Sequence, residues 1–185
     1  MGTEAEDQAT PAARAATSLR YLAAAQTAPR ARPSDGPRRT RPSTPAAPIH
    51  PGILDHVTAA RREVVEHARA VIPEDLVRGP VPREAVEVYR WYEQHTPYLD
   101  AGARRAGEAI MYRQALEHAL RARDTTVIRR ERCPSCRCFS LLWQGALQAA
   151  VCVNDRDLHH GRPRRYTLAQ LAETAVGNSS MRAAT

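Results

Sequence analysis

Residues 133–152 read CPSCRCFSLLWQGALQAAVC, and they decide the fold of the C-terminal third of the chain. Cys133 and Cys136 are separated by two residues, and Pro134 lies in the turn between them. This spacing lets two thiolates bind one metal ion from a tight backbone turn. The segment therefore begins with a metal-binding knuckle.

An apolar run follows the knuckle and has the pattern of a β-hairpin. It predicts a strand over residues 139–143, a turn over 144–146 and a returning strand over 147–151. The returning strand brings Cys152 back beside the knuckle. Two cysteines, a hairpin and a third cysteine outline a zinc-ribbon-like module, so we expect the knuckle cysteines and Cys152 to bind a structural Zn²⁺.

The fourth zinc ligand is open at the level of sequence, because no further cysteine follows Cys152. Structural zinc takes four ligands in a tetrahedral arrangement. The candidates are Asp157, His159, His160 and Cys138. We rank His159 and Asp157 first, since Asp157 gives the spacing C-x4-D and His159 lies within reach of the loop. His160 comes next and Cys138 last, because Cys138 is only two residues from Cys136.

The wider composition indicates a mainly helical protein. The chain has 185 residues, of which 43% are apolar and only 5% aromatic. Small helices can pack through Ala, Val and Leu, whereas a thick sheet sandwich needs bulkier side chains. A chain of this length can bury one ordinary core and a satellite. We expect a small helical bundle, then the zinc-ribbon-like hairpin, then a C-terminal helix.

Three helices are predicted within residues 49–126, from apolar residues at helical spacing. They cover about residues 51–73, 83–95 and 98–123. Short linkers favour an antiparallel bundle that hides the three apolar faces. Arg113 interrupts the apolar stripe of the third helix. It either pairs with an acidic residue of another helix or lies at the edge of the stripe.

The polar residues of the bundle predict an ordinary solvated surface without a catalytic constellation, since exposed charge is the usual state of such side chains. These residues are Glu63, Glu66, Glu84, Glu87, His67 and His95.

Residues 1–48 predict a disordered tail rich in Ala, Pro and Arg. Six prolines lie between residues 29 and 48, and large apolar side chains are scarce. Residues 18–28 have the composition of a transient helix. The tail is either a solvated linker or an arm that settles on DNA or RNA.

The segment before the knuckle, MYRQALEHAL at residues 111–120, and the Cys-Val-Asn that begins at Cys152 resemble a family of uncharacterised actinobacterial (Streptomyces-type) proteins. The resemblance covers roughly residues 50–185. It implies a helical region followed by a zinc-ribbon-like module and an actinobacterial origin, without an activity. In those relatives a fourth cysteine usually stands where this chain has Asp157.

A C-terminal helix is predicted in residues 127–185, after the metal module. Thr167 and Gln170 form a capping box, and Tyr166 is placed to pack against Leu171 as a hydrophobic staple. The start of this helix is also similar to the first helix of a helix-turn-helix. Few residues follow Gly177, so we favour a terminal packing helix.

Basic charge is concentrated in the same part of the chain. The net charge is +7, all basic residues are arginine, and residues 127–185 hold nine arginines against four acidic residues. Such a surface can contact phosphates without reading sequence. The residues expected to form it are Arg129, Arg130, Arg132, Arg162, Arg164 and Arg165.

We therefore expect a non-enzymatic regulatory or accessory protein with a structural zinc module, in contact with nucleic acid through its arginine-rich C-terminal third. The alternative is a protein–protein interaction adaptor, since zinc ribbons serve both purposes. A further alternative is an HNH-like metal nuclease, because residues 157–160 and Pro163 are similar to its metal-binding hairpin. No histidine follows His160, so we do not expect an enzyme.

The expected cellular location rests on two features that the sequence does not contain. No stretch has the length of apolar sequence needed to span a bilayer, and the N-terminus has no signal-peptide core. We expect a cytoplasmic protein without a membrane partner, whose four cysteines are metal ligands or free thiols.

Overall fold

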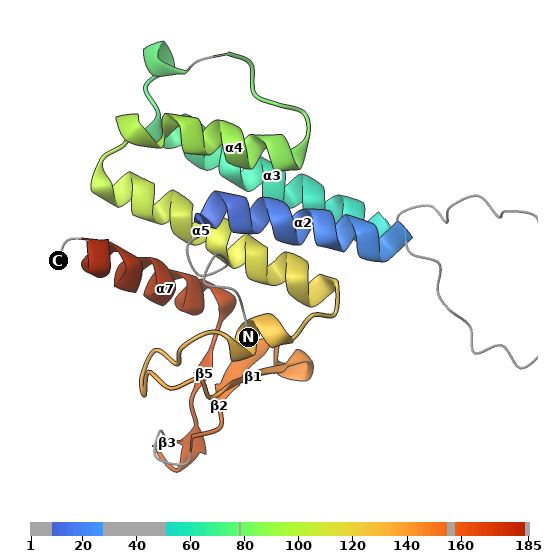
Figure 1. The fold of residues 1–185 in the computed structure, drawn as a ribbon, viewed down its shortest axis with the longest axis vertical. Coiled ribbons are helices and arrows are strands. Elements are labelled where there is room, and N and C mark those ends of the chain that lie inside the picture. The colour runs from blue at the N-terminus through green and yellow to red at the C-terminus, as the bar shows by residue number, and fades with distance from the viewer. Residues whose placement is uncertain (1–8, 28–50, 78, 155–157, 184–185) are drawn as a thin grey trace, which may run out of the picture.

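The computed structural model describes residues 9–27, 51–77, 79–154 and 158–183. In this part of the chain the α-helices are α2 (Pro11–Thr27), α3 (Pro51–Val71), α4 (Ala85–His95), α5 (Ala101–Arg121), α6 (Thr126–Arg129) and α7 (Leu168–Ala183). The strands are β1 (Leu141–Gln144), β2 (Ala149–Cys152), β3 (Leu158–His159), β4 (Arg162–Pro163) and β5 (Arg165–Tyr166). The prediction of a mainly helical fold with a small strand region near the C-terminus is confirmed (Figure 1).

Helix α2 is the main correction to the sequence prediction. We expected no stable structure before residue 48, but α2 packs against α4 and α5 and contributes buried side chains to the core. Those side chains are Ala12, Ala15, Leu19 and Leu22. Their spacing of three and four residues is that of one helix face. The remaining tail, residues 1–8 and 28–48, lies outside the described residues.

The three predicted helices correspond to α3, α4 and α5, and α2 makes the bundle one of four helices. Figure 1 shows α5 between the rest of the bundle and α7. The first turn of α5 is capped by Asp100, whose side chain accepts hydrogen bonds from the backbone N–H groups of Gly102 and Ala103 at 2.7 and 2.9 Å. Val88, Tyr89 and other buried side chains fill the space between the helices.

Gly107 allows α4 and α5 to approach each other closely. A methyl group at this position would overlap the phenol ring of Tyr92, with Cε1 only 2.8 Å away. Tyr92 is fully buried and hydrogen-bonded to His67, so it has no free space into which to move.

We expect Gly107→Ala to lower the free energy of unfolding by about 2 kcal/mol, because overpacking forces the two helices apart. Urea denaturation measures this loss. The matched control is Gly177→Ala in α7, where an added methyl group meets nothing within 4 Å. The control is expected to be neutral or slightly stabilising, since alanine favours helix. Equal effects of the two substitutions would contradict the close contact.

Helix α7 packs along α5 as a terminal helix. The predicted capping box is present. The backbone N–H of Thr167 donates to Gln170 Oε1 at 2.9 Å, and the backbone N–H of Gln170 donates to Thr167 Oγ1 at 3.2 Å. The helix continues without a break through Gly177. The described residues therefore form one packing helix here, not the first half of a helix-turn-helix.

The strands form a small module beneath α5 (Figure 1). One sheet has the order β1-β2-β5, and β3 pairs with β4 in a separate ribbon. All neighbouring strands are antiparallel. A second buried cluster joins this module to the helices, because Tyr112 and Leu116 of α5 and Leu171 of α7 pack together with Leu141 and Ala150 of the sheet.

Candidate metal centre

The knuckle at Cys133 and Cys136 is closed by the backbone. The N–H of Cys133 donates to the carbonyl of Cys138 at 2.9 Å, and the N–H of Arg137 donates to the carbonyl of Cys133 at the same distance. Arg137 has φ of 62°, the left-handed conformation that a tight turn of this kind requires. The turn directs both knuckle thiols to one side.

The hairpin then brings the third cysteine to the knuckle, as predicted. Leu141 of β1 lies opposite Cys152 of β2, and the backbone N–H of Val153 donates to Ser140 at 2.8 Å. The connection is shifted from the prediction. Residues 145–147 form a single 3-10 turn, and Gln148 adopts a left-handed conformation with φ of 47° before β2 begins.

Three sulfur atoms converge at this point. The Sγ atoms of Cys133, Cys136 and Cys152 all lie within 4.8 Å of one another, and those of Cys136 and Cys152 are 3.8 Å apart. The three cysteines are free thiols, and Cys133 and Cys152 are fully buried. Thiolates at this spacing can hold one ion, and the donor set suits Zn²⁺ or another thiophilic metal.

Two hydroxyl groups border the sulfur cluster. Ser140 Oγ lies 3.1 Å from Cys152 Sγ and 3.5 Å from Cys136 Sγ. The Tyr166 hydroxyl lies 3.5 Å from Cys133 Sγ. Neither hydroxyl was anticipated from the sequence. Hydrogen bonds from such groups stabilise thiolate ligands and orient them.

The thiols differ in how readily they ionise. The hydrogen bond with Ser140 lowers the pKa of Cys136, whereas burial raises the pKa of Cys152. A metal ion must displace the proton of a thiol in order to bind it.

Within the part of the chain that the structure describes, none of the candidates for the fourth ligand belongs to the group formed by Cys133, Cys136 and Cys152. His159 in β3 and the neighbouring His160 are exposed, and their ring centroids lie 4.1 Å apart. Cys138 is also exposed, and its Sγ lies 3.5 Å from the carbonyl oxygen of Cys136. Asp157 lies outside the described residues. The structure brings together three ligands, and the fourth stays a prediction.

The predicted arginine surface is solvent-exposed in most of its members. The exposed side chains are Arg129, Arg130, Arg132, Arg162 and Arg165, and Arg164 is half-buried. The guanidinium of Arg132 lies over the ring of Phe139, 4.4 Å from its centroid. These residues come from the segment around α6 and from the β4–β5 segment.

A buried polar network in the bundle was missed at the level of sequence. His118 is fully buried in α5, and its Nδ1 and Nε2 lie 2.8 Å from His56 Nε2 and 2.9 Å from the Tyr89 hydroxyl. Tyr89 donates to Gln114 Oε1 at 2.9 Å. The amide of Gln114 in turn donates to Glu63 at 2.8 Å.

Arg113 is also part of this network. Its ion pairs explain why an arginine can stand in the apolar stripe of α5. Its guanidinium pairs with Glu63 of α3 and with Glu117 of α5. The prediction that Arg113 pairs with an acidic residue of another helix is confirmed.

The prediction of a solvated polar surface is wrong for His95, which is buried against Trp91. Glu63 and His67 are partly exposed, but Glu63 belongs to the network and His67 bonds to Tyr92. The others, Glu66, Glu84 and Glu87, are exposed.

The histidine pair predicts that stability falls in mild acid. Burial, aided by Arg121 and Arg113, lowers the pKa of His56 to about 4 and that of His118 to about 3. Below about pH 6.5 these histidines bind protons in the unfolded chain but not in the folded chain. The free energy of unfolding is therefore at its full value above that pH and declines as the pH falls toward 4.

Denaturant unfolding between pH 7 and pH 4.5 is expected to lose about 2.5 kcal/mol through the buried His118, with a smaller loss through the half-exposed His56. His118→Gln should flatten this pH dependence, because it removes one titrating group. The control His160→Gln, whose ring is exposed, should leave it unchanged. An unaltered slope in His118→Gln would rule out the explanation.

Comparisons with protein-family models, with curated proteins and with solved structures find no match to this chain. Within the described residues, none of the helices combines the length and apolar character needed to cross a membrane. The interpretation of the sulfur cluster therefore rests on its own geometry.

Proposed function

We propose that this chain is a non-enzymatic accessory or regulatory protein in which a structural Zn²⁺ fixes the C-terminal module on the helical bundle. The observation that carries the proposal is the convergence of Cys133, Cys136 and Cys152 within 4.8 Å. An ion at this point ties the knuckle to the hairpin. Because the hairpin shares a core with α5 and α7, the same ion also fixes the module against those helices.

The burial of the sulfurs supports a structural role over a catalytic one. Catalytic zinc keeps an open position for water and substrate, whereas structural zinc is enclosed by its ligands. Cys133 and Cys152 have no exposed surface and belong to the second core. We assign the fourth position to His159 or Asp157, because Asp157 gives the spacing C-x4-D after Cys152 and His159 lies within reach of the same loop.

Elemental analysis of the untagged protein tests this proposal. We expect one zinc per chain in the wild type, none in Cys133→Ser, and weakened retention in either His159→Ala or Asp157→Ala, but not in both. Absence of zinc and of any other metal from wild-type protein purified without chelator would overturn the proposal.

Contact with nucleic acid is a second proposal, favoured by the exposure of five of the six predicted arginines. Binding to a DNA duplex is expected to weaken with salt. A plot of the logarithm of the binding constant against the logarithm of the salt concentration should have a slope of roughly −0.9 for each phosphate contact. Arg162→Gln combined with Arg165→Gln should reduce that slope. The control pair Arg62→Gln and Arg90→Gln, on exposed faces of the bundle, should not. A slope that the first pair leaves unchanged favours the adaptor alternative.

A further inference from the structure

Two thiols of the sulfur cluster lie close enough to be joined by a covalent bond. Cys136 Sγ and Cys152 Sγ are 3.8 Å apart, and Ser140 Oγ lies within 3.5 Å of both sulfurs. A disulfide bond has a length of about 2.05 Å. The gap is therefore closed by a movement of about 1.8 Å, shared between the two side chains.

The members of the sulfur cluster differ in their exposure to a dissolved oxidant. Cys133 and Cys152 are 0% exposed, whereas Cys136 is partly exposed. An oxidant therefore meets the sulfur of Cys136 first, and Cys152 is a buried thiol behind it. An accessible thiol beside a second thiol that can resolve its oxidised form is the arrangement that favours reversible disulfide formation.

The contacts of the sulfurs favour Cys152 over the other cysteines as the partner of Cys136. One hydroxyl group, that of Ser140, lies beside the sulfurs of both Cys136 and Cys152, whereas the sulfur of Cys133 contacts the hydroxyl of Tyr166. Cys138 is exposed, but a single residue separates it from Cys136. A disulfide between such near neighbours is strained, because its geometry is specific.

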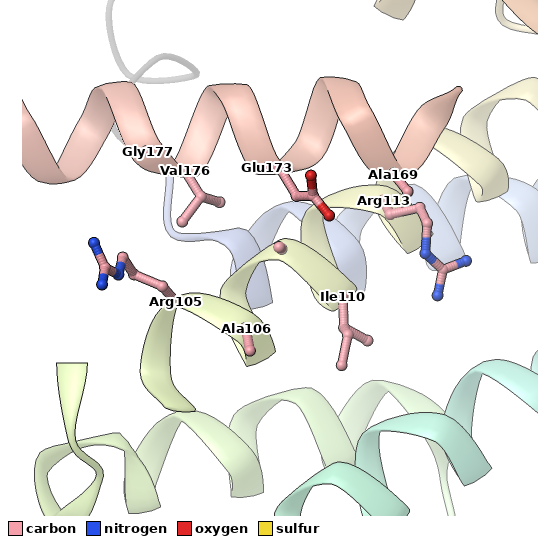
Figure 2. A pocket seen from close by; sticks show the side chains of 9 residues that line it. Arg105, Ala106, Ile110, Arg113, Ala169, Glu173, Val176 and Gly177 are labelled. Carbon is pink, nitrogen blue, oxygen red and sulfur yellow. The ribbon is translucent and has the colours of Figure 1, made fainter. Parts of the chain in front are cut away.

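The surroundings of the pair favour a disulfide over deeper oxidation. Cys152 belongs to the second buried cluster together with Val176 of α7, whose side chain faces α5 in Figure 2. Sulfinic and sulfonic acids are charged and costly to place among apolar side chains, whereas a disulfide is uncharged. Oxidation of the buried sulfur is therefore expected to stop at the disulfide.

One molecule of hydrogen peroxide balances the reaction. The Cys136 sulfur attacks a peroxide oxygen, the O–O bond breaks, a sulfenic acid forms and one water leaves. The Cys152 sulfur then attacks the Cys136 sulfur, the S–O bond breaks, the S–S bond forms and a second water leaves. The two thiols are oxidised by two electrons and the peroxide is reduced by two. Where the sulfurs are thiolate ligands, solvent supplies the two protons.

The structure assigns Cys136 and Cys152 as the site of a reversible disulfide that peroxide forms and that releases the metal ion. The disulfide rests on the sulfur geometry alone, whereas the release of the ion also rests on the proposed function. Thiolates bind metal ions, so the disulfide leaves Cys133 as the one remaining sulfur ligand of the three. The knuckle stays tied to the end of β2, through a covalent bond in place of the ion.

Peptide mapping of the full-length chain after peroxide treatment tests the disulfide. Unreacted thiols are blocked with iodoacetamide, and the chain is cleaved with trypsin without a reductant. Cleavage at arginine places both knuckle cysteines in residues 133–137 and places Cys138 and Cys152 in residues 138–156. The predicted disulfide joins these two peptides, and fragmentation in the mass spectrometer should place the bond between Cys136 and Cys152.

The matched control is Cys138→Ser, at the exposed thiol outside the sulfur cluster, and it should form the same joined peptides. Dithiothreitol should separate them and restore both thiols. A disulfide confined to the knuckle, loss of the joined peptides in Cys138→Ser, or sulfonic acids in place of the disulfide would each overturn the assignment.

A chelating dye measures metal release in the same samples. We expect one zinc ion released for each disulfide formed, and zinc bound again after treatment with dithiothreitol. Zinc retained by a fully joined chain would contradict its release by oxidation. A chain that holds no metal before treatment would instead contradict the proposed function, and the joined peptides alone would then decide whether the disulfide forms.

Discussion

Removing the metal ion is expected to unfold the C-terminal module while the helical bundle remains folded. Chelation of the wild type, or Cys152→Ser, should cost the module more than about 3 kcal/mol, because structural zinc contributes roughly 10–16 kcal/mol of binding free energy to small domains. The strands of the module have only two to four residues each, so we expect its apolar contacts alone to be too few to keep it folded.

The two tryptophans allow this unfolding to be followed separately in each part. Trp143 lies in β1 of the module and Trp91 in α4 of the bundle. Fluorescence of Trp143 and proteolysis within residues 127–167 should change after chelation, while helical circular dichroism keeps most of its intensity. The control Cys138→Ser, at an exposed thiol outside the sulfur cluster, should behave like the wild type. A module that resists chelator would show that the hairpin core suffices without metal.

Leu22→Ala is expected to destabilise the bundle by about 3 kcal/mol, the usual cost of truncating a buried leucine. Leu22 is 0% exposed in the interface that α2 forms with the bundle, whereas the adjacent Tyr21 is 55% exposed. Tyr21→Ala is therefore the matched control and should change the free energy of unfolding by less than about 0.5 kcal/mol. Urea denaturation of the two variants gives both numbers.

Helix α2 also reaches the metal module, so this prediction concerns more than the bundle. Arg14 donates to the Tyr112 hydroxyl at 2.8 Å, and Tyr112 donates to the buried Glu131 at 2.7 Å. Glu131 is two residues from Cys133. Similar stabilities for Leu22→Ala and Tyr21→Ala would mean that α2 does not dock, and that the original prediction of an unstructured N-terminal segment applies to the whole tail.

The sulfur cluster was predictable because its information is local. The spacing of Cys133 and Cys136 sets the turn, and a short apolar run interrupted by Gly145 predicts the hairpin that returns Cys152. The hydroxyls of Ser140 and Tyr166 were not predictable in the same way. Tyr166 reaches Cys133 only because β5 pairs with β2, a contact that strand propensity does not specify.

The sequence does contain a helix start for α2, but the Ala-, Pro- and Arg-rich composition of residues 1–48 as a whole favoured a disordered tail. Thr10 and Pro11 form a good helix start, since a proline at the first helical position needs no hydrogen-bond partner. The backbone N–H of Ala13 donates to Thr10 Oγ1 at 3.2 Å. All of the later prolines of the tail follow Thr27. Two alanines and two leucines at helical spacing form the interface, and the alanines gave little hydrophobic contrast in the sequence.

The polar network of the bundle could not be predicted from the sequence, for a different reason. Periodicity assigns a residue to a face of a helix, but it does not identify partners on other helices. His56 and His118 are 62 residues apart, and Gln114 and Glu63 are 51 apart. Polar side chains on the helices were therefore read as exposed, while tertiary packing placed several of them in mutual contact.

Cobalt(II) substitution tests the central claim most directly, because thiolate ligands produce a sulfur-to-cobalt charge-transfer absorption and tetrahedral geometry produces intense d–d bands. We predict both signals at one equivalent of cobalt in the wild type and in Cys138→Ser, with loss of the charge-transfer intensity in Cys136→Ser. A wild-type chain that gives no thiolate signal, or one that Cys136→Ser leaves intact, would contradict a metal centre at Cys133, Cys136 and Cys152.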